Sequence, residues 1–182
     1  MMRTASGMVG DTFVFRRWRG KQIVANRPKP REEGGPSARQ LEIQEKFANA
    51  SAYAKQVISN PATKALYETG IGGTLYTAYM VAMSDYLNAP KVLDIDATGY
   101  KGVVGDEILI KATDDFKVTT VRVDLTNAAG ALIESGSAVQ DPIIRQLWHY
   151  VATVANQGVS GSAVKATAID TPGNKGFLDK VL

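Results

Sequence analysis

Apolar residues recur with a helical period in the middle of the chain and with a strand period after it. Between residues 37 and 89, apolar positions three or four residues apart stand among charged and amide residues, as in helices with one buried face. Ser37 and Gln40 have the spacing of a capping box, and Asn60 followed by Pro61 suits the start of another helix. The pattern predicts a helical subdomain over 37–89, with helices over roughly 37–58, 61–68 and 74–88.

From Val92 onward, apolar and polar residues alternate in short runs rich in valine, isoleucine and threonine. Val121, Val123 and Leu125 alternate with polar neighbours, as a strand with one buried and one wet face requires. The turns between the runs are too short for the helical crossovers that parallel strands need. The pattern predicts an antiparallel β-sandwich over 90–182, with strands near 92–97, 107–112, 118–126, 131–139, 146–154, 163–169 and 176–181.

The region before the helices differs in both pattern and charge. Two strand-like runs, Thr12–Phe15 and Gln22–Val24, flank a glycine-containing turn, which predicts a short basic hairpin or an extended arm. Two strands alone are marginally stable in water, so this element is expected to need another surface. Asn26–Pro36 is rich in proline and glycine and is expected to be a linker. Residues 1–36 are therefore predicted to form a basic arm and its linker.

The net charge of +3 hides an asymmetry. Residues 1–31 contain eight lysines and arginines against one acid, a formal charge of +7, whereas the remaining 151 residues contain 13 bases and 17 acids, a charge of −4. A basic arm thus precedes a mildly acidic body, and such an arm favours an acidic partner.

Composition removes most catalytic chemistry. The chain has no cysteine and one histidine, which excludes disulfides, thiol nucleophiles, zinc fingers and paired-histidine sites. We expect His149 to be a partly exposed strand residue, because its sequence neighbours offer no partner for a general base. The glycines of 70–73 match no phosphate-binding fingerprint, and we interpret them as residues that end one helix before the next begins. We therefore expect a protein that is not an enzyme and has no cofactor.

Several aspartates near the predicted turns raise the alternative of a calcium site, because sandwich ends can gather carboxylates. The residues concerned are Asp94, Asp96, Asp106, Asp114, Asp115 and Asp170. They lack the fixed ligand spacing of an EF-hand, and aspartates in turns more often accept backbone hydrogen bonds. No metal ligand is therefore predicted.

Nothing in the hydropathy pattern predicts a membrane segment. No stretch approaches the ~20 apolar residues that span a bilayer, and Gly10, Asp11 and the arginines after them interrupt any leader-like apolar run at the start. We expect a protein that is made and kept in the cytoplasm, or that is built into something assembled there.

Half of the chain resembles bacterial and phage immunoglobulin-like domains. The resemblance is carried by Asp106–Phe116, Val118–Ala131, Trp148–Val154 and Val164–Asn174, without the paired cysteines of antibody domains. It implies an immunoglobulin-like sandwich and says little about a ligand.

The front half resembles uncharacterised structural or assembly proteins of tailed phages and prophages of Bacteroidota. The matching residues are Gly10–Phe15, Gly20-Lys21, Asn26–Lys29, Gln44, Phe47, Ala50 and Tyr53–Lys55. The resemblance implies a virion protein and brings no catalytic residues with it.

In the arm, basic residues are interleaved with aromatic and aliphatic ones, which favours docking on a neighbouring protein subunit. The docking residues predicted are Phe13, Phe15, Arg16, Arg17, Trp18, Arg19, Lys21 and Ile23. The sequence thus predicts an α+β protein that serves as a non-enzymatic virion component (capsid-accessory, connector or tail protein) in a homo- or hetero-oligomeric assembly.

Three alternatives stay open at this point. The arm can instead bind nucleic acid through its arginines and Trp18, which would make the chain an accessory protein, or it can pack locally on the helices. The sandwich can also belong to a surface adhesin that binds carbohydrate, an alternative that predicts export.

Overall fold

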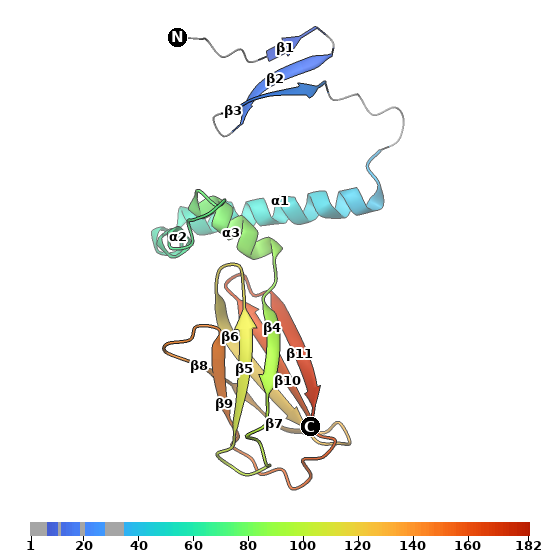
Figure 1. Cartoon of the computed structure of the whole chain (residues 1–182), viewed down its shortest axis with the longest axis vertical. Coiled ribbons are helices and arrows are strands. Elements are labelled where there is room, and N and C mark those ends of the chain that lie inside the picture. The colour runs from blue at the N-terminus through green and yellow to red at the C-terminus, as the bar shows by residue number, and fades with distance from the viewer. Residues whose placement is uncertain (1–6, 11, 19–20, 28–34) are drawn as a thin grey trace. The chain divides into compact units, whose positions relative to one another are not determined.

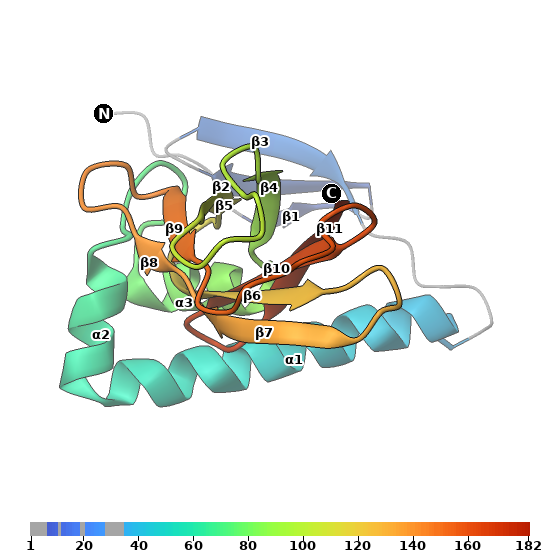
Figure 2. The same ribbon diagram turned by 90° about the horizontal axis from the view of Figure 1, so that it is seen from below.

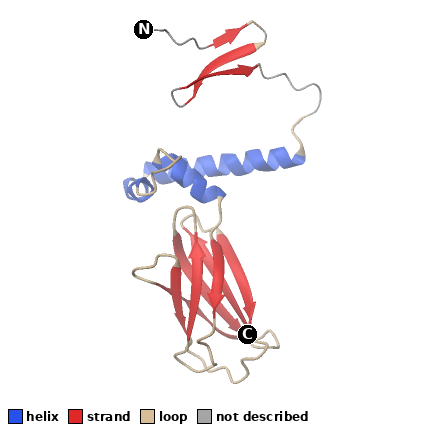
Figure 3. Ribbon diagram, viewed as in Figure 1, coloured by secondary structure: helices blue, strands red, loops and turns tan. Residues whose placement is uncertain are grey.

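The computed structural model describes residues 7–10, 12–18, 21–27 and 35–182. The chain divides into two compact units, Met1–Leu41 and Glu42–Leu182. Within the described residues, all helices lie in the middle of the sequence, between three N-terminal and eight C-terminal strands (Figure 3). The protein is therefore a sheet-rich α+β structure, as the sequence predicts.

The C-terminal strands pair into two sheets in which all neighbours are antiparallel (Figure 1). The strands are β4 (Lys91–Asp96), β5 (Glu107–Thr113), β6 (Val118–Thr126), β7 (Leu132–Ser137), β8 (Val139–Gln140), β9 (Leu147–Val151), β10 (Ala163–Asp170) and β11 (Lys175–Val181). One sheet has the order β4-β5-β9-β8 and the other has the order β11-β10-β6-β7. Seen from below, β10, β6 and β7 run side by side (Figure 2).

Alternate residues of both sheets point into one apolar core. Val121, Val123 and Leu125 of β6 are fully buried, while the polar residues between them are not. The structure thus confirms the predicted antiparallel sandwich. The predicted strand 131–139 is confirmed over Leu132–Ser137, which forms β7, but its end is wrong, because the chain leaves one sheet after β7 and joins the other at β8. Buried Ala138 stands at this crossing.

Three helices precede the sandwich: α1 (Ala38–Ser59), α2 (Pro61–Glu68) and α3 (Ala78–Leu87). The predicted capping box forms at the start of α1, where the amide of Ser37 donates to the side chain of Gln40 at 3.0 Å and the amide of Gln40 donates to the hydroxyl of Ser37 at 3.3 Å. Asn60 caps α2, as predicted. Across the described part of the chain, no helix combines the length and the apolar character that a membrane span requires.

The third helix starts later than the sequence predicts, at Ala78 instead of residue 74. Gly72 and Leu75 exchange two backbone hydrogen bonds of 2.9 Å in an isolated bridge, which keeps this stretch out of helical geometry. Thr77 then caps α3 with its side chain. Leu75, which the sequence pattern assigns to the first turn of the helix, is therefore held in the bridge.

The helices pack against one end of the sandwich through Phe116, which lies in the turn between β5 and β6. Its ring stacks on that of Tyr67 in α2, with the centroids 4.8 Å apart. A β-carbon at Gly70 would lie 2.8 Å from the Phe116 ring, so close approach as well as helix ending explains this glycine. The buried residues of the helical core are Ala54, Tyr67, Ala78, Val81 and Ala82.

The N-terminal unit contains a three-stranded antiparallel sheet in the order β1-β2-β3. Its strands are β1 (Gly7–Val9), β2 (Phe13–Trp18) and β3 (Lys21–Asn26). The sequence predicts only the last two, because β1 has three residues and is too short to show an alternating pattern. The predicted turn at Arg19 and Gly20 and residues 28–34 of the predicted linker lie outside the described residues.

Candidate functional site

The residues predicted to form the docking arm lie on two neighbouring strands. The structure places Phe13, Phe15, Arg16, Arg17 and Trp18 on β2 and Lys21 and Ile23 on β3, while Arg19 lies outside the described residues. In the β2–β3 register, Phe15 pairs with Val24 and Arg16 pairs with Ile23. Because directly paired residues share a face of a sheet, the predicted docking residues divide between two faces.

Each face of this sheet combines apolar and basic side chains. Phe13, Phe15, Val24 and exposed Arg17 share one face, where Phe13 is 45% and Val24 is 54% exposed. Ile23 and exposed Arg16 share the other face. The predicted docking residues therefore do not form a single aromatic surface. They divide into two surfaces, each of which carries apolar and basic side chains.

The first half of α1 is exposed on every side. All residues from Ala38 to Asn49 are exposed, and the large apolar side chains of Ile43 and Phe47 are 58% and 56% exposed. These two residues have helical spacing to Ala50 and Ala54, which are fully buried, so all four lie on one stripe of the helix. The apolar stripe therefore extends beyond the part of α1 that is buried.

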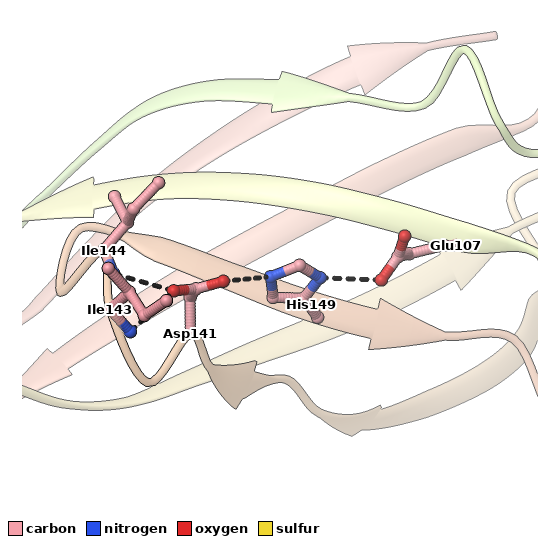
Figure 4. Close-up of polar contacts among 5 residues, drawn as sticks. All are labelled: Glu107, Asp141, Ile143, Ile144 and His149. Carbon is pink, nitrogen blue, oxygen red and sulfur yellow. Dashed lines mark hydrogen bonds and ion pairs between the residues drawn. The ribbon is translucent and has the colours of Figure 1, made fainter.

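His149 on β9 lies between two carboxylates (Figure 4). Its Nδ1 is 2.6 Å from Oε1 of Glu107 on β5, and its Nε2 is 3.1 Å from Oδ2 of Asp141 in the loop before β9. The backbone amides of Ile143 and Ile144 donate to Asp141. The prediction of a partly exposed strand histidine is confirmed, but the prediction that it lacks partners is wrong, because both acids reach it only through the folded sheet.

The two carboxylates favour the protonated form of His149. Hydrogen bonds to Glu107 and Asp141 raise the pKa of His149 above its ordinary value. The backbone amides of Ile144 and Ile143 lower the pKa of Asp141. Because both ring nitrogens already contact carboxylates, neither is left to take a proton from a substrate.

A second group of titratable residues lies where the helices meet the sandwich. Asp85 belongs to α3, Asp114 to the turn after β5 and Asp170 to the end of β10. One carboxylate oxygen of each lies within 4.8 Å of the other two. Asp85 is fully buried, and Asp170 is 3% exposed. Three segments far apart in the sequence thus bring their acids to one place, which we call the acidic junction.

Neutral donors orient the acidic junction. The hydroxyl of Tyr67 donates to Oδ2 of Asp85 at 2.7 Å, and the side-chain amide of Asn174 donates to Oδ2 of Asp170 at 2.8 Å. The backbone amide of Lys117 donates to Oδ2 of Asp114 at 3.0 Å. The other oxygens of Asp85 and Asp114, both named Oδ1, are buried and have no hydrogen-bond partner among the described residues.

The charge of the acidic junction is uncompensated. The pKa of Asp85 is raised to about 7, mainly by burial and to a smaller extent by the charges of Asp114, Asp170 and Asp115, while the hydrogen bond from Tyr67 acts in the opposite direction. Burial also raises the pKa of Asp170. Within the described part of the chain, no lysine or arginine forms an ion pair with any of the three junction acids.

The six aspartates considered in the sequence have mixed roles. Four of them accept backbone hydrogen bonds in turns, as predicted: Asp96, Asp106, Asp114 and Asp170. Two of these four also belong to the acidic junction. Sequence reasoning missed Asp85, because it lies within a predicted helix. The signal that could have found it is a single acid in an otherwise apolar helix, AYMVAMSDYL.

An open groove of about 730 Å³ borders the acidic junction. The residues at the end of α2, the turn between β5 and β6, and the segment before β9 line it. Asp114 and Phe116 belong to its wall, together with the cations Lys117 and Arg145. Asp114 therefore connects the buried acids to solvent.

Comparisons with known proteins leave the family open. No protein-family model matches the chain, and no curated protein matches it. Among solved structures, CopC from Methylosinus trichosporium OB3b is similar over 50% of this chain and 87% of its own, with 13% identity and a TM-score of 0.37. An engineered protein is similar over 60% of this chain and 23% of its own, with 16% identity and a TM-score of 0.32. Similarities this weak carry no argument about function, and the fold is established by the strand pairing itself.

Proposed function

We propose that this chain is a non-enzymatic structural subunit of a phage virion, and that its N-terminal region binds a neighbouring subunit. The exposed first half of α1 carries the proposal. Twelve exposed helical residues are marginally stable in water, and Ile43 and Phe47 continue the buried stripe of the same helix. A second protein surface over this stripe explains both features.

The partner that fits best is a second copy of the chain. Residues 1–31 have a formal charge of +7, and the remaining 151 residues have a formal charge of −4. The N-terminal region of one copy and the body of the next therefore attract each other, which favours fast and oriented association. Both faces of the β1-β2-β3 sheet add apolar side chains to this attraction.

We also infer that the sandwich is immunoglobulin-like. Immunoglobulin domains pair their strands in the order A-B-E-D in one sheet and G-F-C in the other, and variable-type domains add C′ beside C. The orders β4-β5-β9-β8 and β11-β10-β6-β7 correspond to A-B-E-D and G-F-C-C′, which supports this inference. The resemblance of the front half to phage proteins supports the virion assignment. In such a subunit the sandwich is the compact module and the N-terminal region is the connector.

Light scattering on the full chain tests the docking. We expect oligomers whose mass rises with concentration, and a monomer when residues 1–36 are deleted. Phe47→Glu places a charge on the exposed stripe and should weaken association at least tenfold. Ala52→Glu adds the same charge at an exposed position on another side of α1 and should leave association unchanged.

Two results would count against the proposal. A deleted chain that assembles normally would show that the N-terminal region is not the docking element. A full chain that stays monomeric but retains DNA or RNA, with affinity that falls steeply as salt rises, would favour the nucleic-acid alternative. Mass spectrometry of purified phage particles tests the virion assignment separately, since the chain should be among their proteins.

A further inference from the structure

The acidic junction has no role in the docking described above. Asp85, Asp114 and Asp170 each place a carboxylate oxygen within 4.8 Å of the other two. Carboxylates this close do not all ionise unless something compensates their charge. Because no lysine or arginine among the described residues pairs with them, a proton or a bound cation must do so.

Two orphaned oxygens favour the cation. Asp85 is 0% exposed, and its Oδ1 has no hydrogen-bond partner among the described residues, nor has the buried Oδ1 of Asp114. Buried polar atoms without a partner are costly and rare. A cation bound between the carboxylates would give such atoms a partner.

Hydrogen bonds hold one oxygen each of Asp85 and Asp114 and both oxygens of Asp170, whose Oδ1 accepts the backbone amides of Gly173 and Asn174. Tyr67 binds one oxygen of Asp85 and leaves the other free, and the backbone amide of Lys117 does the same for Asp114. Asn174 holds Asp170 and also donates to the backbone carbonyl of Asp85 at 3.1 Å. Partners of this kind fix the direction of metal ligands and strengthen binding.

We propose that Asp85, Asp114 and Asp170 bind a calcium ion, which fastens α3 to the end of the sandwich. All three ligands are hard carboxylate oxygens, the type that Ca²⁺ prefers. Two oxygens bound to one Ca²⁺ at 2.3–2.6 Å lie at most about 5 Å apart, which matches the spacing here. Asp114 also lines the open groove, so water can complete the six to eight ligands that Ca²⁺ takes.

Magnesium fits this site less well than calcium. Mg²⁺ demands a nearly ideal octahedron of oxygens at 2.0–2.1 Å, whereas Ca²⁺ accepts irregular arrangements. Mg²⁺ also retains several of its waters, which a fully buried ligand such as Asp85 does not favour. The proposal is therefore specific for Ca²⁺, and it is independent of the proposed docking and of the virion assignment.

Calcium titration of the full chain tests the site. Isothermal calorimetry and thermal melting would be measured after EDTA treatment, at constant ionic strength. We expect saturable binding of one Ca²⁺ per chain, and a melting temperature raised by about 5 °C or more at a hundredfold excess over Kd. Terbium, used as a luminescent substitute for calcium, should be sensitised by the tyrosine hydrogen-bonded to Asp85, and Ca²⁺ should displace it.

Matched variants separate the site from general charge effects. Asp85→Asn and Asp114→Asn should each weaken Ca²⁺ binding at least tenfold and abolish the rise in melting temperature. Asp94→Asn makes the same chemical change at an exposed position of β4 and should bind like the unaltered chain. If Asp85→Asn does not fold, Asp114→Asn still decides the question.

Three results would overturn the assignment. The first is an unaltered chain that neither binds Ca²⁺ nor melts higher at millimolar concentrations. The second is equal loss of binding in Asp94→Asn, which would indicate a diffuse counter-ion effect. The third is equal stabilisation by Mg²⁺ at the same concentration, because it would contradict the calcium preference inferred from the coordination geometry and from the buried ligand Asp85.

Discussion

The sandwich core and the helical core differ in size and in chemistry. The sandwich core contains 18 buried residues, all of them aliphatic or aromatic, and most come from alternating positions of the two sheets. The helical core contains five, and it depends on Phe116 of the sandwich and borders the buried carboxyl group of Asp85. Because a small core buries too little apolar surface to be stable alone, the helices depend on the sandwich, whereas the sandwich closes its core with its own strands.

Separating the two regions should produce the largest effect. We expect residues 90–182 to fold alone with a cooperative thermal transition, since both sheets and their core are retained. Residues 35–89 alone should show no cooperative transition, because they lose the aromatic ring on which Tyr67 stacks. Circular dichroism melts of the two fragments measure this difference. A cooperative melt of the helical fragment would refute the dependence inferred from the cores.

Phe116→Ala should loosen the connection without unfolding the sandwich. The ring is partly buried against the helical core, so we expect a loss of about 2 kcal/mol, below the range for a fully buried phenylalanine. Hydrogen exchange should become faster in α2 and α3 and stay slow in β6 and β10. Phe177→Ala, at a position 63% exposed on β11, is the control and should change stability by at most about 0.5 kcal/mol. Uniformly faster exchange would mean that the two regions unfold as one.

His149→Gln should have the smallest effect, and the effect should depend on pH. The folded protein raises the pKa of His149, so the bridge to Glu107 and Asp141 stabilises the fold below the ordinary pKa of about 6.5 and is lost as pH rises through the raised value. Because the group is partly exposed, we expect about 0.5 kcal/mol. Urea unfolding at about pH 5 and about pH 9 measures it, and a loss that is larger at pH 9 would contradict the sign.

The sequence-based predictions were correct where a feature depends on residues close together in the sequence, and they failed where it does not. The capping box of Ser37 and Gln40 and the alternation of Val121, Val123 and Leu125 were predictable, because they depend on residues within a few positions of each other. The start of the third helix was misjudged because a bridge between Gly72 and Leu75 competes with helical hydrogen bonds. Strand β1 was missed because three residues are too few to show an alternation of apolar and polar positions.

The site residues divide in the same way. The sequence located the two strands that carry the predicted docking residues, but it did not indicate that Phe15 and Arg16 belong to opposite faces, which the β2–β3 register decides. It identified Asp114 and Asp170 as turn formers and missed Asp85, because nothing local relates an acid in α3 to two acids in the sandwich. The partners of His149 were missed for the same reason.

By itself, the sequence determined the order of the elements, the antiparallel sandwich, the charge asymmetry and the lack of cysteine chemistry. Periodicity, caps and composition depend on local geometry and on counting residues, so they can be read without coordinates. Only the tertiary structure decided that Asp85, Asp114 and Asp170 meet and that His149 bridges two acids. Those contacts depend on how the sheets and helices pack, which brings residues 85, 114 and 170 to one place although at least 29 positions separate them along the chain.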